Sequence, residues 1–248
     1  MPVKPRLHAI DATRGVLAVV VAAHHVATGW LHEATLLAAN VAVIVFFMMS
    51  GYVLALAYRG GYWGFLLRRL VRLWPVYAVC IAAGYALRGQ APPLADLAWW
   101  PSAFDPAHSP DPPAWSLFIE AWVTPVLPAL FLIARRGRVA AVLMVAGALV
   151  LMQVKPALFP LLFFAIGAAA AAFPISWPER MPGPLLWLGR VSYSLYLSHV
   201  VVLAACGPVL GATLILPVAW ALWWAVERPS ISWSRFAGAA AVPVPARA

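Results

Sequence analysis

Arg14 and His25 lie eleven residues apart in the first long apolar stretch of the chain, IDATRGVLAVVVAAHHVATGW (10–30). On an α-helix this spacing puts the two side chains on one face, about 16 Å apart along the axis, whereas His24 points about 80° away from that face. Ionisable groups are costly inside a membrane span and by default indicate a functional site. The alternative is that Arg14 extends to the lipid headgroups while His25 only packs against a neighbouring helix.

Three arginines form a second group within YRGGYWGFLLRRLVRLWPVY (58–77). They are Arg68, Arg69 and Arg72. The two glycines before them predict a helix break and Pro75 predicts the start of a new span, so residues 62–73 are expected to form an amphipathic helix on the cytoplasmic surface. On that helix the three guanidinium groups fall within about 100° of one another. Such a cluster suits a bound phosphate, and it equally suits anionic lipid.

A carboxylate and a polar stripe lie in two later apolar segments. Glu120, in PAWSLFIEAWVTPVLP (113–128), is about one turn inside a predicted span, where a carboxylate must be protonated, paired or bound to a ligand. Trp115 and Ser116 just before it suit an interface anchor and a helix cap. In LGRVSYSLYLSHVVV (188–202), one helix face carries Ser192, Tyr196 and His199. That stripe predicts either interhelical hydrogen bonds or the wall of a cavity.

Depth along the predicted spans brings several of these groups together. His25, Glu120, His199 and Asn40 are all expected in the outer half of the bilayer, which predicts one polar chamber in which Glu120 orients His25. Asp11, three residues before Arg14, either orients that arginine or forms an ordinary ion pair at the helix start.

The elements that position these residues are membrane-spanning helices. The chain is 64% hydrophobic and only 10% charged, with a mean hydropathy of +0.87, whereas soluble domains average about 25% charged residues. We therefore expect an all-α, polytopic transmembrane bundle of about eight spans, as one domain over 1–236 with a disordered tail at 237–248. The expected spans are 10–30, 36–58, 74–87, 116–134, 139–154, 157–173, 186–206 and 211–226.

Positive charge gives the expected orientation. Most of the 17 Lys and Arg residues lie in segments that a cytoplasmic N-terminus places inside, whereas the predicted outer segments hold only Arg88 and Lys155. This bias predicts that both termini are cytoplasmic, and it accounts for the net charge of +9 without nucleic acid binding. The two cysteines, Cys80 and Cys206, fall within spans and predict no disulfide, and no cysteine cluster indicates a metal.

Six blocks in order carry a resemblance to a known family. They are DATRG with a later histidine, FFMMSGYVLALAYR with Ser50, FLLRRLVRLWPVY, WSLFIE, LGRVSYSLYLSH and VERP. The series resembles the membrane-bound acyltransferase 3 family, bacterial O-acyltransferases of cell-surface glycans and related molecules. The resemblance implies a protein of the bacterial inner membrane that takes an acyl group from acyl-CoA, its donor substrate, without a bound cofactor. The acceptor it implies is a hydroxyl of a glycan or small molecule.

The resemblance also implies roles for particular residues. His25 and Arg14 would be required for activity, with Glu120 as a third catalytic group, and Arg69 and Arg72, joined by Arg68, would contact acyl-CoA. Supporting positions are Asp11, Ser50, Asn40, Trp115, Ser116, Tyr196 and His199. The chain departs from the family by lacking one pair of spans. Two alternatives therefore remain open: a transporter or flippase-like bundle whose polar groups line a permeation path, and a catalytically inactive relative.

Overall fold

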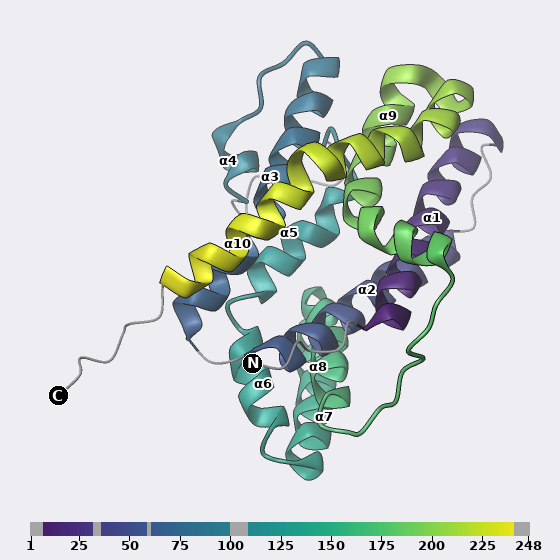
Figure 1. Cartoon of the computed structure of the whole chain (residues 1–248). Coiled ribbons are helices and arrows are strands. Elements are labelled where there is room, and N and C mark those ends of the chain that lie inside the picture. The colour runs from purple at the N-terminus through teal and green to yellow at the C-terminus, as the bar shows by residue number, and fades with distance from the viewer. Residues whose placement is uncertain (1–6, 32–35, 59–60, 100–108, 241–248) are drawn as a thin grey trace.

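The computed structural model describes residues 7–31, 36–58, 61–99 and 109–240 of the 248-residue chain. Every regular element in these ranges is helical, which confirms the all-α prediction (Figure 1). The elements are α1 His8–Leu31, α2 Leu36–Ala57, α3 Tyr62–Leu87, α4 Leu94–Leu97, α5 Ala114–Val123, α6 Leu127–Ala134, α7 Arg138–Val154, the 3-10 turn η1 Pro156–Leu158, α8 Phe159–Ala170, α9 Gly183–Leu222, the π-helical turn η2 Trp223–Glu227 and α10 Arg228–Ala240.

Several of these helices suit a bilayer. Within the described residues, four helical stretches are long and apolar enough to cross a membrane: His8–Thr28, Ala38–Ala57, Tyr62–Leu87 and Gly183–Phe236. The bent pair α5 and α6 makes a fifth if it counts as one span. The helices α7 and α8 are apolar but shorter. The chain is therefore a multi-pass membrane protein, and a count of eight spans stays a prediction.

The separate surface helix expected at 62–73 is wrong, because α3 runs without a break from Tyr62 to Leu87 with Pro75 inside it. A proline removes one backbone donor, but membrane helices tolerate that loss when neighbouring helices support the freed groups. Here the residues around the proline, Leu73, Val76 and Tyr77, are buried in the bundle. Only the glycine prediction holds: Gly61, with a φ of 74°, caps the start of α3. The arginines consequently belong to a long helix that is partly buried in the bundle.

The single span expected at 116–134 is instead two helices, α5 and α6, bent by 64°. Pro125 lies at the break, where it cannot donate a backbone hydrogen bond, and Pro128 lies in the first turn of α6. The Thr124 hydroxyl donates to the Glu120 carbonyl at 2.6 Å, beside the Thr124 backbone N–H, which donates to the same oxygen at 2.9 Å. The bend therefore has a local cause in the sequence.

A second break divides α9 at Gly207, whose φ of 73° and ψ of 170° are not helical. After it the chain turns back toward α10, as Figure 1 shows. Gly211 packs on Val202 and Leu203, and Ser194 donates to Glu227, so the second half of α9 lies along the first. The break falls between the spans expected at 186–206 and 211–226. It places the His199 segment inside the bundle, covered by its own continuation.

Two helix crossings depend on glycine. A Cβ at Gly189 of α9 would lie 2.2 Å from the Asp11 carbonyl oxygen of α1, and a Cβ at Gly167 of α8 would lie 1.9 Å from the Met48 carbonyl oxygen of α2. Small residues at such contacts let helix backbones approach closely within membranes. The first crossing fixes α1, which carries Arg14 and His25, against α9.

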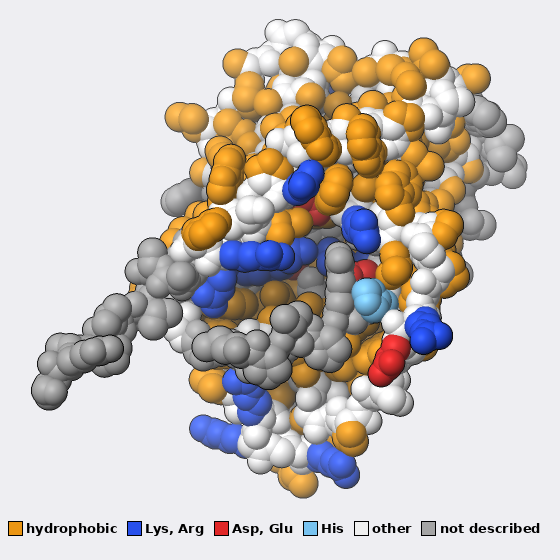
Figure 2. Space-filling model, viewed as in Figure 1, with side chains coloured by type: hydrophobic (Ala, Val, Ile, Leu, Met, Phe, Trp, Pro, Cys, Tyr) orange, Lys and Arg blue, Asp and Glu red, His pale blue; other side chains and the backbone are white. Residues whose placement is uncertain are grey.

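The outside of the bundle is apolar. On α7, Val139 and Val154 are 75% and 73% exposed, as expected of side chains that face lipid. Figure 2 shows apolar side chains over most of one face, with lysine and arginine side chains gathered in its middle below α10. Helix α10 includes residues 237–240, which the sequence assigned to the tail. Residues 241–248 lie outside the described residues.

Candidate active site

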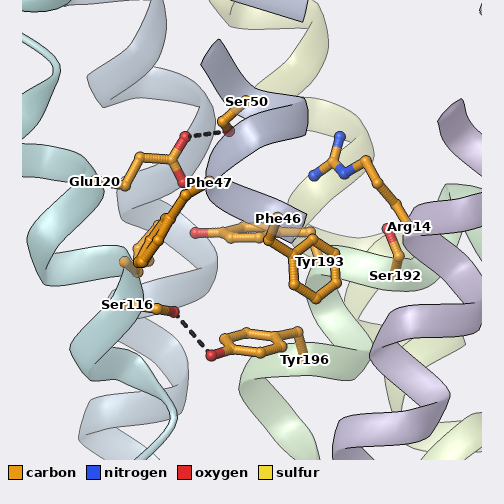
Figure 3. A pocket seen from close by; sticks show the side chains of 10 residues that line it. Arg14, Phe46, Phe47, Ser50, Ser116, Glu120, Ser192, Tyr193 and Tyr196 are labelled. Carbon is orange, nitrogen blue, oxygen red and sulfur yellow. Dashed lines mark hydrogen bonds between the residues drawn. The ribbon is translucent and has the colours of Figure 1, made fainter. Parts of the chain in front are cut away.

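A first cavity lies between α1, α2, α5 and α9 (Figure 3). It encloses about 510 Å³ of empty space, including a part open to the outside. Its lining residues are Arg14, Phe46, Phe47, Ser50, Ser116, Leu117, Glu120, Ser192, Tyr193 and Tyr196. Aromatic rings from α2 and α9 lie beside charged and hydroxyl groups, so the cavity suits a ligand with both apolar and polar parts.

Glu120 is held on this cavity by two partners. The Ser50 hydroxyl donates to its carboxylate at 2.8 Å, and the Arg69 guanidinium forms an ion pair with the same oxygen. Both charged side chains are largely buried, and the Nε of Arg69 has no hydrogen-bond partner among the described residues. A buried guanidinium with a donor to spare is suited to a further anionic ligand. Arg69 itself is not on the cavity wall and reaches it through Glu120.

Arg72, further along α3, is close enough to Arg14 of α1 for the two guanidinium groups to repel each other. Two carboxylates, those of Glu227 and Asp11, attract the Arg72 guanidinium. Glu227 is buried in the π-helical turn, where it accepts hydrogen bonds from the Ser194 hydroxyl at 2.6 Å and backbone N–H at 3.3 Å. Three cations and their balancing carboxylates are thus concentrated on and beside the wall of the first cavity.

A second cavity contains the histidines. Its lining residues are Val21, His24, His25, Ala39, Asn40, Val43, Pro112, Pro113, Trp115 and Tyr196, and it encloses about 550 Å³ of empty space, again partly open. His24 lies on this wall together with His25, although its side chain leaves the helix in a different direction.

His25 is flanked by two other imidazole rings. The ring centroid of His24 is 5.1 Å away in an edge-on contact, and that of His199 is also 5.1 Å away, tilted by 43°. His199 is fully buried, and its Nδ1 lies 3.2 Å from the Leu195 carbonyl oxygen. Its Nε2 has no hydrogen-bond partner among the described residues.

Tyr196 lines both cavities. Its hydroxyl shares a 2.8 Å hydrogen bond with Ser116 and donates to the Pro113 carbonyl oxygen at 3.1 Å, which ties α9 to the start of α5 (Figure 3). Beside it, Trp115 stands edge-on to Phe47 with 6.1 Å between ring centroids. Tyr196 and Ser116 therefore form part of the wall between the two cavities.

The two cavities are stacked along the helices. The first takes Arg14, Ser50, Glu120 and Ser192 from α1, α2, α5 and α9, and the second takes His25, Asn40, Trp115 and Tyr196 from the same four helices. Contacts of Gly15 with Gly189 and of His25 with His199 show that α1 and α9 run parallel. The chain order in all four helices then places the second cavity at the end where α1 finishes and α2 begins.

The structure divides the predicted site residues between these two places. Glu120 pairs with Arg69 and Ser50 on the first cavity, while His25, Asn40 and Trp115 border the second and His199 lies behind His25. The single chamber expected from depth alone is thus two cavities, because the bend after α5 and the continuity of α3 bring Arg69 to the carboxylate. Arg68 is half-buried on α3 and lines neither cavity.

Sequence reasoning missed Glu227 and Tyr193. The Glu227 carboxylate attracts the Arg72 guanidinium. Tyr193 lines the first cavity, and its hydroxyl donates to the Leu73 carbonyl oxygen at 2.6 Å. An acid next to an apolar segment is the same signal that drew attention to Glu120, and it was available for Glu227. Tyr193 had no such signal, since a tyrosine in a membrane helix is ordinary.

Asp111 is a buried carboxyl in the loop before α5, next in sequence to Pro112 and Pro113 on the wall of the second cavity. Its side chain is 0% exposed, and neither oxygen has a hydrogen-bond partner among the described residues. Burial raises the pKa of this carboxyl well above its ordinary value. Within the described residues, no group of three or more His, Cys, Asp or Glu side chains is placed to hold a metal ion.

Comparison with known proteins identifies the family. No curated protein and no solved structure matches the chain. The acyltransferase 3 family of acyltransferase domains matches residues 7–173, and the match covers only part of the family's length. That segment contains all of α1, α2 and α3, with Arg14, His25 and the arginine cluster, and it also contains Glu120. It ends before His199. The chain therefore belongs to the acyltransferase 3 family, as a membrane-embedded acyltransferase.

Proposed function

We propose that this protein is an integral membrane O-acyltransferase that moves an acyl group, such as acetyl, from cytoplasmic acyl-CoA to a hydroxyl of a cell-envelope glycan or related acceptor. The observation that carries the proposal is the stacked pair of cavities that share Tyr196. One cavity lies against the buried cations and the other contains a histidine open to a ligand. A transferase that joins a cytoplasmic donor to an outer acceptor needs both, placed end to end.

The donor side is the arginine cluster. Acyl-CoA carries several phosphates, and guanidinium groups bind phosphate through charge-assisted hydrogen bonds. We assign this contact to Arg69 and Arg72, with Arg14 on the cavity wall and Arg68 nearby on α3. The pantetheine arm and thioester would then extend through the first cavity, past Tyr196, toward His25. The distance of about 16 Å from Arg14 to His25 along α1 fits an extended arm.

The chemistry is centred on His25. In one route its neutral imidazole takes the proton of the acceptor hydroxyl, the oxygen attacks the thioester carbonyl carbon, and the carbon–sulfur bond breaks to release coenzyme A, whose thiolate takes up the proton. In the other, a ring nitrogen of His25 attacks the thioester carbonyl carbon and the carbon–sulfur bond breaks to release coenzyme A as the thiolate. The acceptor oxygen then takes the acyl group from the nitrogen, and the hydroxyl proton passes to the thiolate. Trp115 and Asn40 border the space in which the acceptor would lie.

The orientation of the bundle completes the proposal. With both termini in the cytoplasm, the end of α1 and the start of α2 face outward, and so does the histidine cavity. The break at Gly207 and the hairpin of α7 and α8 support eight passes, some of them short, in a bacterial inner membrane. The missing pair of spans would remove part of the acceptor side rather than the arginine cluster.

The decisive experiment uses purified protein in lipid nanodiscs with acetyl-labelled acetyl-CoA. Release of free coenzyme A thiol, together with label on the protein or on an added glycan acceptor, supports the proposal. A transporter or an inactive relative predicts no thiol release above that of empty nanodiscs. Loss of release in His25→Ala, with the same amount of folded protein, ties the activity to this site and excludes a contaminant.

A further inference from the structure

We infer that His199 is a positioning residue that orients His25, so that the two imidazoles work as a pair. The inference rests on the proposed function and adds the group that fixes the reactive histidine. A catalytic histidine needs a partner on one ring nitrogen in order to present the other nitrogen to the substrate. In many sites that partner is a carboxylate, but here Glu120 is engaged by Arg69 and Ser50.

The geometry of the two rings fits this role. Two imidazoles joined by an N–H···N hydrogen bond of about 2.9 Å have centroids about 5 Å apart. The centroids of His25 and His199 are 5.1 Å apart, with 43° between the ring planes. A rotation of the His25 ring, which lies at the wall of an open cavity, is enough to align a nitrogen with its buried neighbour.

The surroundings of His199 determine its tautomer. Its Nδ1 lies 3.2 Å from the Leu195 carbonyl oxygen, and a carbonyl only accepts, so Nδ1 is the protonated nitrogen. The Nε2 is then a hydrogen-bond acceptor, fully buried and without a partner among the described residues. A buried acceptor left unsatisfied is destabilising, and the nearest ring that offers an N–H is that of His25.

The other groups that face His25 serve this role less well. His24 is its neighbour in sequence and stands edge-on to it at the rim of the cavity, and Asn40 is exposed at the start of α2. The Tyr196 hydroxyl already bonds Ser116 and the Pro113 carbonyl. With His199 accepting its N–H, His25 presents an unprotonated nitrogen to the cavity, where the acceptor hydroxyl or the thioester would lie.

Two nearly isosteric substitutions separate this role from a structural one. The amide of His199→Gln reaches the position of Nε2 and keeps an acceptor toward His25, whereas the amide of His199→Asn reaches the position of Nδ1 and keeps only the bond to Leu195. Ser198→Ala, at a buried neighbour on the same turn, is the control for packing. Acyl transfer is measured for each variant as kcat and as KM for acetyl-CoA, after matched amounts of folded protein are confirmed by thermal melting.

We expect His199→Asn to lower kcat by about tenfold to hundredfold with KM unchanged, as loss of a histidine's orienting partner does elsewhere, and His199→Gln to recover most of it. Ser198→Ala is expected to stay within about twofold of the unsubstituted protein. Equal loss in both His199 variants, no loss in either, or better activity in His199→Asn overturns the inference. Better activity in His199→Asn would mean that the hydrogen bond of His199 to Leu195 is structural and that His199 does not orient His25.

A second measurement does not depend on the reaction. Diethylpyrocarbonate acylates the unprotonated nitrogen of histidine, and tandem mass spectrometry resolves His25 from His24. The rate at His25 is expected to fall by about threefold or more in His199→Asn but not in His199→Gln, because only the latter holds the tautomer. If this pattern appears while the protein shows no thiol release, the proposed function fails and the pairing stands. Equal rates in the two variants overturn the pairing.

Discussion

His25 has the two features that histidine chemistry requires, access to a ligand and a fixed environment. It borders the second cavity, and it is held between His24 and the buried ring of His199. Its spacing from Arg14 could be deduced from helical geometry alone, since α1 is a regular helix. The pairing of Glu120 with Arg69 could not be deduced in this way, because an ion pair between α3 and α5 depends on how separate helices pack.

The adjacent histidines provide a matched test at this scale. His25→Ala removes the proposed base and is expected to lower acyl transfer by at least about a hundredfold, as loss of a general base does. His24→Ala changes the same cavity wall but leaves His25 and His199 in contact, so we expect a loss of less than about tenfold. Both are measured as thiol release at equal membrane levels. Similar activity in the two variants would contradict the role of His25.

Asp111 gives a pH-dependent prediction for stability. Its pKa in the folded protein is raised by burial, whereas the unfolded chain exposes it near its ordinary pKa of about 3.9. The folded state therefore binds the proton more tightly. Its contribution to stability is complete below about pH 4 and is lost as the pH rises toward the folded pKa.

Asp111→Asn replaces the carboxyl with a neutral group of similar size and removes that loss. We expect the variant to melt at a higher temperature than the unsubstituted protein at pH 8, by about 2–4 °C per kcal/mol, and at nearly the same temperature at pH 4. Thermal melting in detergent at both pH values measures this. A difference in melting temperature that is equal at pH 4 and pH 8 means that Asp111 ionisation is not responsible.

At the scale of elements, proline and glycine decide where the helices break, but only part of this is visible in the sequence. Pro125 bends the α5–α6 segment, and Gly207 turns α9 back on itself. Pro75 does neither, because its flanking residues are buried against other helices. The local signal is the same in each case, so the outcome depends on tertiary packing that the sequence does not display.

The crossing of α1 and α9 is expected to be intolerant of any side chain at Gly189. A Cβ there would lie 2.2 Å from the Asp11 carbonyl oxygen, so Gly189→Ala must push the helices apart at a cost of about 1–3 kcal/mol. Because α1 carries Arg14 and His25, activity should fall with the melting temperature. The control is Gly147→Ala on α7, where a Cβ meets nothing within 4 Å and alanine favours the helix. Equal melting temperatures for the two variants would mean that the crossing is not tightly packed.

For the whole molecule, composition and the order of motifs gave the class and the family correctly, because hydropathy and charge report directly on a bilayer. The number of spans was harder, since α7 and α8 are too short for certain assignment by length. The separation of the site into two cavities was not predictable. It arises because the same four helices, two in each direction, contribute residues to both cavities.

The orientation of the whole bundle decides which cavity faces the cytoplasm. We expect a cysteine introduced by Arg136→Cys, after α6, to react with a membrane-impermeant thiol reagent only in inverted membrane vesicles. The background is a chain with Cys80 and Cys206 replaced by alanine. A cysteine introduced by Gly89→Cys, after α3, is expected to react only from the opposite side. Labelling of both sites from one side would contradict the orientation on which the donor and acceptor assignments depend.

The central claim is that the buried arginines bind acyl-CoA, and isothermal titration with a non-hydrolysable acyl-CoA analogue tests it most directly. Arg72→Gln leaves the ion pair of Arg69 and Glu120 intact, and the double variant with Arg69→Gln removes both contacts, each expected to contribute about 1.5–3 kcal/mol. The exposed Arg136→Gln is the control for net charge. We predict a Kd about tenfold or more weaker for Arg72→Gln, a further loss for the double variant, and no change for the control. An unchanged Kd in folded Arg72→Gln and in the double variant would contradict the account.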